Sequence, residues 1–289
     1  MLPNNAGIKK YLNLKVYLII ALGLSFVFVF YPIWKELLQT WYTSDDYSHG
    51  FFIVPLVVFA LWQKREVLSR LPRQSSPLGL ALLVGSLVLY ILALYAEIRT
   101  IASLAMVFVI VGAVLFIFGK TIFREISFIL FFLFFMIPIP AQIYSAMTIP
   151  LQLIVSKVSV WAVMLFGLPV FREGNVIHLP ERTLEVVQAC SGLRSLMTLL
   201  TLSLIVSYFT LRSNTLRVLL VMSGLPVAIA VNIFRVLIMI VAFYYFNYDL
   251  TVGRVHTIFG ILVFVLAIVL IFIIKGVLSL WDTPEIKQS

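Results

Sequence analysis

Long apolar segments separated by short polar ones run along most of the chain. A helix needs about 20 mostly apolar residues to cross the hydrocarbon core of a bilayer, so the pattern predicts about eight membrane-spanning helices. We expect these spans near residues 14–34, 50–62, 78–95 and 98–118, in a phenylalanine-rich run that stops at Pro138, and near 191–211, 218–245 and 256–275. The sequence therefore predicts an all-α polytopic membrane protein, with residues 1–289 forming a single integral membrane domain.

Two segments between the fifth and sixth spans have different patterns. Residues 147–168 are apolar, but Gln152, Ser156 and Ser159 fall on one helical face, which predicts an amphipathic helix at the outer interface. A full crossing by this helix is the alternative, and it would move the next segment to the cytoplasmic side. Residues 174–188 alternate apolar and polar positions around Pro180, which predicts a short β-hairpin that leads directly to Cys190.

Composition excludes an ordinary soluble domain. The chain is 62% hydrophobic and 11% charged, and its mean hydropathy is +1.11. Its formal net charge is +9, but the basic residues lie in short loops between apolar spans, which indicates membrane topology and argues against a nucleic-acid partner. Placing the basic loops inside predicts a multi-pass plasma-membrane protein with both termini in the cytoplasm. The beginnings of the sixth and eighth spans then lie at the outer face.

Cys190 is the only cysteine and stands where the predicted hairpin meets a helix. The positive end of the helix dipole favours a thiolate at such a position, so we expect the pKa of this thiol to be lowered. A small residue of the apolar core is the alternative interpretation. A lone cysteine excludes an internal disulfide, and three histidines are too few to favour a zinc cluster. The sequence thus predicts neither a metal site nor a cofactor.

Arg235 lies inside the seventh predicted span, where a charged side chain costs roughly 2.5 to 3.5 kcal/mol on insertion scales. Asn232 is three residues earlier on the same helical face, and His256 opens the last span. Structural roles are the alternatives, with Arg235 binding backbone carbonyls and His256 as a packing residue. Together with Cys190, these residues supply a thiol nucleophile, a fixed cation and a proton acceptor, the minimum set for acyl transfer through a thioester.

Four segments resemble signature segments of one known family. They read DDYSHGFFIVP from Asp45, ACSGLRSL from Ala189, NIFRV from Asn232 and RVHTIFG from Arg254. In this order, they are similar to segments of the exosortase/archaeosortase family of membrane-embedded cysteine transpeptidases. The resemblance extends over residues 45–260.

The resemblance implies a role for each of several residues. Cys190 would be the nucleophile, Arg235 the oxyanion-stabilising residue and His256 the acid/base. Arg254 is the alternative third residue, because some relatives use an arginine there. Apart from the resemblance, Arg194 would position substrate, support the thiolate or anchor the surface, and His49 would line the same cavity or begin a helix.

The reaction implied is cleavage of an exported protein near a C-terminal sorting tail. In this family such tails combine a Pro-Glu-Pro-like motif, an apolar helix and a basic end. The expected partners are therefore exported substrate proteins, membrane lipid and an amine acceptor that the sequence does not identify. The rival hypothesis is a non-catalytic transporter or polysaccharide-export component, in which Arg235 and Asn232 line a path.

Overall fold

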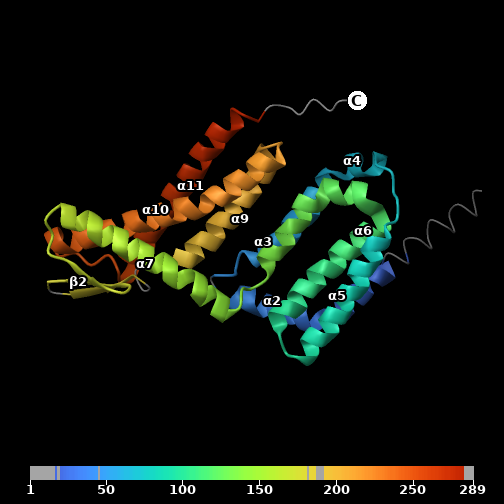
Figure 1. Ribbon diagram of the computed structural model, residues 1–289, viewed down its shortest axis with the longest axis horizontal. Helices are drawn as coiled ribbons and strands as arrows, with labels where there is room; N and C mark the ends of the chain where they lie inside the picture. The colour runs from blue at the N-terminus through green and yellow to red at the C-terminus, as the bar shows by residue number, and fades with distance from the viewer. Residues whose placement is uncertain (1–16, 18–19, 45, 181, 187–191, 283–289) are drawn as a thin grey trace, which may run out of the picture. The chain divides into compact units, whose positions relative to one another are not determined.

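The computed structural model describes residues 17, 20–44, 46–180, 182–186 and 192–282, and of residues 192–195 only the backbone (Figure 1). The chain divides into two compact units, residues 1–138 and residues 139–289. We call them unit 1 and unit 2 and describe each by itself. That both belong to one integral membrane domain remains a prediction.

Unit 1 is helical. It contains a helix Ile20–Val29, α2 (Tyr31–Thr43), α3 (Gly50–Gln63), α4 (Arg65–Arg70), α5 (Pro77–Tyr95), α6 (Arg99–Phe131) and the short 3₁₀ helix η1 (Phe132–Met136).

The structure departs from the first predicted span after residue 29. Helix Ile20–Val29 ends at a bend of 69°, and α2 continues from it to Thr43. The predicted span ends near residue 34, whereas the helix continues to Thr43. A proline in the first turn of α2 explains the bend, because it has no N–H to donate to the preceding turn. Ile33, Leu37 and Trp41 form the buried face of α2.

The predicted fourth and fifth spans are joined without a loop. Gly119 lies inside α6 with a φ of +83°, a left-handed conformation that glycine adopts without strain. A side chain at Gly119 would also collide with the carbonyl of Gln74. Beyond this kink, Lys64 Nζ forms an ion pair with Glu125 and donates a hydrogen bond to its carbonyl at 3.0 Å. The pair fixes the later part of α6 to the end of α3.

Helices α5 and α6 pack closely because glycines lie between them. A Cβ on Gly79 would collide with the backbone of Leu115 and Phe116, and one on Gly112 would meet Leu83. Small residues at a helix interface allow backbones to approach in this way, as is common in membrane proteins.

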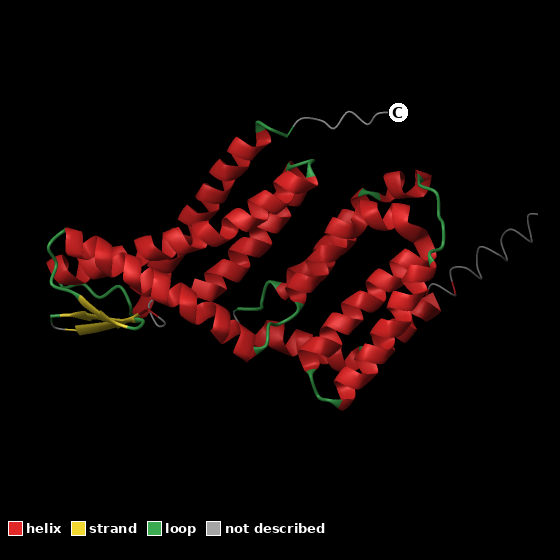
Figure 2. Cartoon of the chain, viewed as in Figure 1, coloured by secondary structure: helices red, strands yellow, loops and turns green. Residues whose placement is uncertain are grey.

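Unit 2 combines helices with a small sheet (Figure 2). Its elements are α7 (Ala141–Leu165), β1 (Phe171–Glu173), β2 (Val176–Leu179), β3 (Arg182–Glu185), α9 (Gly192–Thr210), α10 (Asn214–Phe246) and α11 (Gly253–Ser279). The sheet is antiparallel with strand order β1-β2-β3, and Leu179 pairs with Arg182. The predicted hairpin is thus confirmed over β2 and β3, whereas β1 was not predicted.

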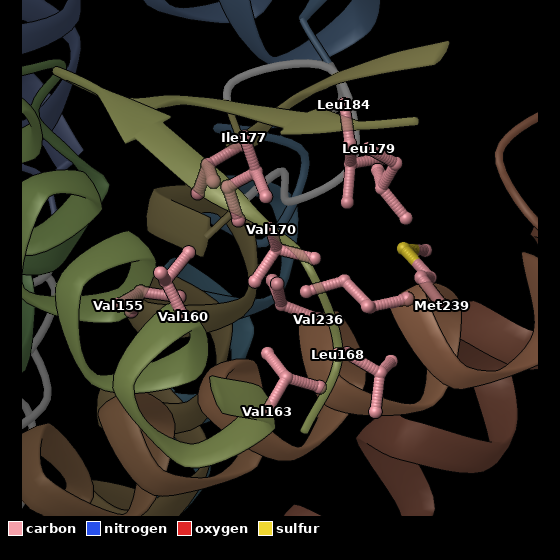
Figure 3. Close-up of a cluster of buried hydrophobic side chains, with 12 residues drawn as sticks. Val155, Val160, Val163, Leu168, Val170, Ile177, Leu179, Leu184, Val236 and Met239 are labelled. Carbon is pink, nitrogen blue, oxygen red and sulfur yellow. The ribbon is translucent and has the colours of Figure 1, made fainter. Parts of the chain in front are cut away.

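The sheet is held against α7 and α10 by an apolar cluster (Figure 3). Ile177 and Leu184 contribute from the strands, Val155 from α7 and Val236 and Met239 from α10. All five side chains are buried. Burial of this kind provides most of the driving force for packing a short sheet onto helices.

The polar face predicted for α7 points into the protein. Ser156 Oγ donates to the carbonyl of Gly174 at 3.1 Å, and Ser159 Oγ lies 3.5 Å from the carbonyl of Ile233. Both serines are fully buried. These serines therefore need no contact with water. The polar face that suggested an interfacial helix is explained by hydrogen bonds within the protein. The interfacial location itself stays a prediction.

Five described helical segments are long and apolar enough to cross a membrane, namely α5, α6 with η1, α7, α10 and α11. A sixth results if the bent pair Ile20–Val29 and Tyr31–Thr43 is one span. The eight predicted spans are not confirmed, because α3 and residues 196–210 of α9 are shorter apolar helices and α6 continues across its kink. The apolar helices nevertheless define a multi-pass membrane protein.

Candidate active site

Arg235 and His256 meet between α10 and α11. The Arg235 side chain is only 4% exposed, and its Nη2 lies 3.3 Å from His256 Nε2. A buried cation in a helix of this kind is costly unless polar groups surround it. The sequence pointed to these two residues as parts of one reactive set, and the structure brings them into hydrogen-bonding distance.

The second nitrogen of the His256 ring determines the tautomer. Nδ1 lies 3.1 Å from the carbonyl oxygen of Leu250. A carbonyl only accepts hydrogen bonds, so in the neutral ring Nδ1 carries the hydrogen and Nε2 is the acceptor. The Arg235 guanidinium then donates to Nε2. The loop before α11 thus orients the imidazole, and α10 supplies the donor to its basic nitrogen.

Gly260 lies beside the guanidinium. It lies one turn after His256 on α11, and a Cβ at this position would be 3.6 Å from Arg235 Nη2. A small pocket borders the guanidinium here, lined by residues of α9, α10 and α11 that include Asn232, Arg235 and Gly260. The sequence analysis did not single out Gly260, although it stands in the RVHTIFG segment at the spacing of one helical turn.

Asn232 also lines a second pocket, between α7, α9 and α10. Its other polar members include Gln152 and Thr148 from α7. Val186 lines it as well, and it is the last described residue before the segment that contains Cys190. Gln152 was predicted only as part of a polar stripe, and its place opposite Asn232 could not be read from the sequence.

The other candidate residues of unit 2 are Arg254, Cys190 and Arg194. Arg254 is exposed in the first turn of α11, so His256, and not Arg254, contacts Arg235. Cys190 lies outside the described residues. Arg194 falls in the first turn of α9, and its side chain is likewise not described. The catalytic roles of these residues remain predictions.

His49 belongs to unit 1, in the turn that leads into α3. Its Nε2 lies 3.0 Å from the carbonyl of Phe135, so the ring joins this turn to η1. Burial lowers the pKa of His49, and hydrogen bonds with the Phe135 and Asp46 backbone only partly oppose this effect. This geometry agrees with the structural alternative given for His49, a residue that fixes the start of a helix.

Within the described ranges, no group of three His, Asp or Glu side chains is placed to hold a metal ion. In unit 2 the guanidinium of Arg235 meets the imidazole of His256. Asn232 lines one pocket together with Arg235 and another together with Gln152.

The fold and this pair of residues define a class, a multi-pass helical membrane protein with a buried arginine beside an oriented histidine. A family model described as transmembrane exosortase matches residues 41–273. Because the match covers most of the chain, the protein belongs to the transmembrane exosortase family, as the four motifs predicted. No curated protein sequence and no solved structure matches the chain.

Proposed function

We propose that the protein is a membrane cysteine transpeptidase that cleaves the C-terminal sorting tail of exported proteins and transfers them to an amine acceptor. The observation that carries this proposal is the hydrogen-bonded pair of Arg235 and His256 in a chain of the exosortase family. Cys190, in the ACSGLRSL segment of the same unit, supplies the nucleophile.

The first half of the reaction forms a thioester. His256 Nε2 takes the proton of the Cys190 thiol, and the sulfur attacks the scissile carbonyl carbon to give an oxyanion. The oxyanion collapses, the carbon–nitrogen bond breaks, and the leaving amine takes the proton from His256. The substrate is then held to Cys190 as a thioacyl-enzyme, and the tail departs.

The second half reverses these roles. An acceptor amine attacks the thioester carbonyl carbon and gives up a proton, and the carbon–sulfur bond breaks to restore the Cys190 thiol. Water in place of the amine gives simple hydrolysis. His256 handles the proton in both halves, as microscopic reversibility requires.

Arg235 has two positions in this scheme. In the structure its Nη2 donates to His256 Nε2, which occupies the nitrogen that must accept the thiol proton. Moving the guanidinium onto the developing oxyanion frees Nε2 and stabilises the negative charge at the same time. A single donor to an oxyanion is worth about 10²- to 10³-fold in turnover. Gly260, which has no side chain, borders the guanidinium in its present position.

Membrane location supports the same function. A substrate with an apolar tail lies in the same bilayer, which raises its effective concentration at the enzyme. The distribution of basic residues favours the plasma membrane, cytoplasmic termini and a site at the outer face.

Mass spectrometry of the purified protein tests the proposal. The protein is incubated in detergent with a peptide that carries a Pro-Glu-Pro motif, an apolar helix and a basic end, and wild type is compared with Cys190→Ala. We expect a thioester adduct on the Cys190 peptide of wild type and no adduct in the variant. Full activity of Cys190→Ala in cells, with cleavage of several tails by neither protein, would instead support a transport path along Arg235 and Asn232.

A further inference from the structure

Within the described residues, β3 forms an edge of the sheet, because the strand order is β1-β2-β3. Val186 N–H donates to the carbonyl of Asn175 at 3.0 Å, and the register pairs Leu184 with Ile177. In an antiparallel ladder the peptide groups of alternate residues point to the same side. The N–H and C=O groups of Thr183 and Glu185 therefore point away from β2.

A pocket lies next to β3, between the sheet and α10. It is lined by residues of β3, of α10 and of the loop before α11, among them Arg182, Thr183, Phe243, Asp249 and Leu250. Arg182 forms an ion pair with Asp249, which fixes the loop to the start of the strand. The carbonyl of Leu250, in the same loop, orients His256. A shared pocket and the Arg182–Asp249 ion pair thus connect β3 to the loop that holds the proposed acid/base.

The same strand leads to the proposed nucleophile. Cys190 follows Glu185 by five residues, a distance of at most about 18 Å in extended chain. Thr183 and Glu185 are exposed on the strand, whereas Leu184 between them is buried against α10. A polypeptide hydrogen-bonded along this edge would therefore contact residues that precede Cys190 by seven and five positions in the sequence.

We propose that the substrate binds as an added β-strand on the outer edge of β3. Its extended segment, on the N-terminal side of its apolar helix, would exchange main-chain hydrogen bonds with Thr183 and Glu185. An added strand lies about 4.8 Å from its neighbour and is recognised through its main chain, with side-chain pockets adding selectivity. This inference rests on the proposed function, because it names the docking mode of the acyl donor.

An N-methyl scan of the substrate tests strand addition without altering the protein. Each non-proline position of a fluorescent Pro-Glu-Pro-tail peptide is N-methylated in turn, and its binding to Cys190→Ala in nanodiscs is measured by anisotropy. N-methylation removes one main-chain donor, so we expect Kd to rise about tenfold at alternate positions and to change little at those between them. A flat profile, or no binding of the unmodified peptide, would overturn the proposal.

Variants of β3 test the same contact from the other side. Thr183→Pro and Glu185→Pro each remove one outward N–H and leave the donors toward β2 in place. Thr183→Val and Glu185→Gln keep both donors and serve as matched controls for the side chains. We expect weaker peptide binding only in the proline variants, with thermal unfolding checking that they fold. Unchanged binding in folded proline variants would contradict strand addition.

The two proposals fail differently. If wild type forms the thioester with unmodified and N-methylated peptides alike, the transpeptidase stands and docking on β3 is overturned. If binding alternates along the peptide but wild type forms no adduct, docking on β3 stands and the proposed chemistry fails.

Discussion

Each unit contains a histidine that lies near the start of a helix and donates a hydrogen bond to a backbone carbonyl. His49 in unit 1 binds the carbonyl of Phe135 through Nε2, and His256 in unit 2 binds that of Leu250 through Nδ1. The second nitrogen of His256 faces the buried cation Arg235. A hydrogen bond to a carbonyl therefore shows only that the imidazole ring is held in place. The partner of the second ring nitrogen distinguishes a structural histidine from a candidate catalytic one.

The largest effect that would distinguish the two histidines is expected from a variant that retains only one nitrogen at the position of His256. An asparagine places its amide nitrogen near the position of Nδ1, so His256→Asn retains the donor to Leu250 and removes the acceptor Nε2. General acid–base catalysis is worth about 10²- to 10⁴-fold, so we expect turnover to fall by that factor. The measurement is single-turnover cleavage of the tail peptide.

Thermal unfolding provides the control for His256→Asn. The variant should unfold close to the wild-type temperature, whereas His256→Ala should lose about 1 kcal/mol with the hydrogen bond to Leu250. Normal turnover in His256→Asn would exclude His256 as the acid/base and return attention to Arg254.

Two glycines, one in each unit, should respond differently to replacement by alanine. In unit 1, a Cβ at Gly79 would collide with the backbone of Leu115 and Phe116, so Gly79→Ala should cost about 1 to 3 kcal/mol of stability. In unit 2, a Cβ at Gly260 would make ordinary contact with Arg235. Gly260→Ala should therefore fold normally, and we expect it to lower turnover by restricting the guanidinium. Unfolding temperatures and peptide cleavage, measured for both variants, distinguish the two outcomes.

The pH dependence of unit 1 should follow His49. Burial lowers its pKa below the ordinary value of 6.5, so the unfolded chain binds the proton more readily than the folded one. The contribution to stability is complete above pH 6.5 and is lost as the pH falls through the folded pKa. His49→Gln, which keeps a donor near Nε2, should reduce the difference in unfolding temperature between about pH 7.5 and about pH 5. An unchanged difference would contradict this assignment.

His49→Leu removes the donor altogether. It should lower stability by about 1 kcal/mol at neutral pH, since the carbonyl of Phe135 loses its partner. Neither His49 variant should reduce turnover by the factor expected for His256→Asn, and a comparable loss would remove the distinction between the two histidines.

The smallest effect is expected at Asp282, beyond the end of α11. Its carboxylate accepts hydrogen bonds from the backbone N–H groups of Arg212 and Ser213, at 2.8 Å and 3.1 Å. Slight burial raises its pKa, but these two donors and the charges of Arg212 and Arg217 outweigh burial and hold the pKa below its ordinary value of 3.8. The stabilisation is present above that pH and is lost as the pH falls through the lowered pKa. Asp282→Asn should therefore flatten acid unfolding slightly, as measured by intrinsic fluorescence.

Much of the helical pattern could be predicted from hydropathy. The predicted spans 78–95, 218–245 and 256–275 match α5, α10 and α11 to within a few residues. Most of helix α2 was missed because the first predicted span ended near residue 34. The spacing of Ile33, Leu37 and Trp41 at every fourth position was an available signal for a helix.

Other features depend on tertiary contacts that no local pattern encodes. The turn at Gly119 forms against the carbonyl of Gln74, far along the chain. The sequence indicated that Arg235 and His256 lie near the same end of the protein, but their contact requires a particular rotation of α10 and α11 about their axes. Helix packing fixes that rotation, and with it the choice of His256 over Arg254 as the neighbour of Arg235.

The inward-facing serines of α7 have a consequence for biosynthesis. α7 is the least apolar of the five candidate spans, and its buried hydroxyls bind the carbonyls of Gly174 and Ile233, which leave the ribosome 18 and 74 residues after them. When α7 first reaches the translocon, those partners do not yet exist. Stable insertion of α7 should therefore follow the synthesis of α10. In a nascent chain truncated after α9, we expect α7 to be more accessible to protease than it is in the full chain.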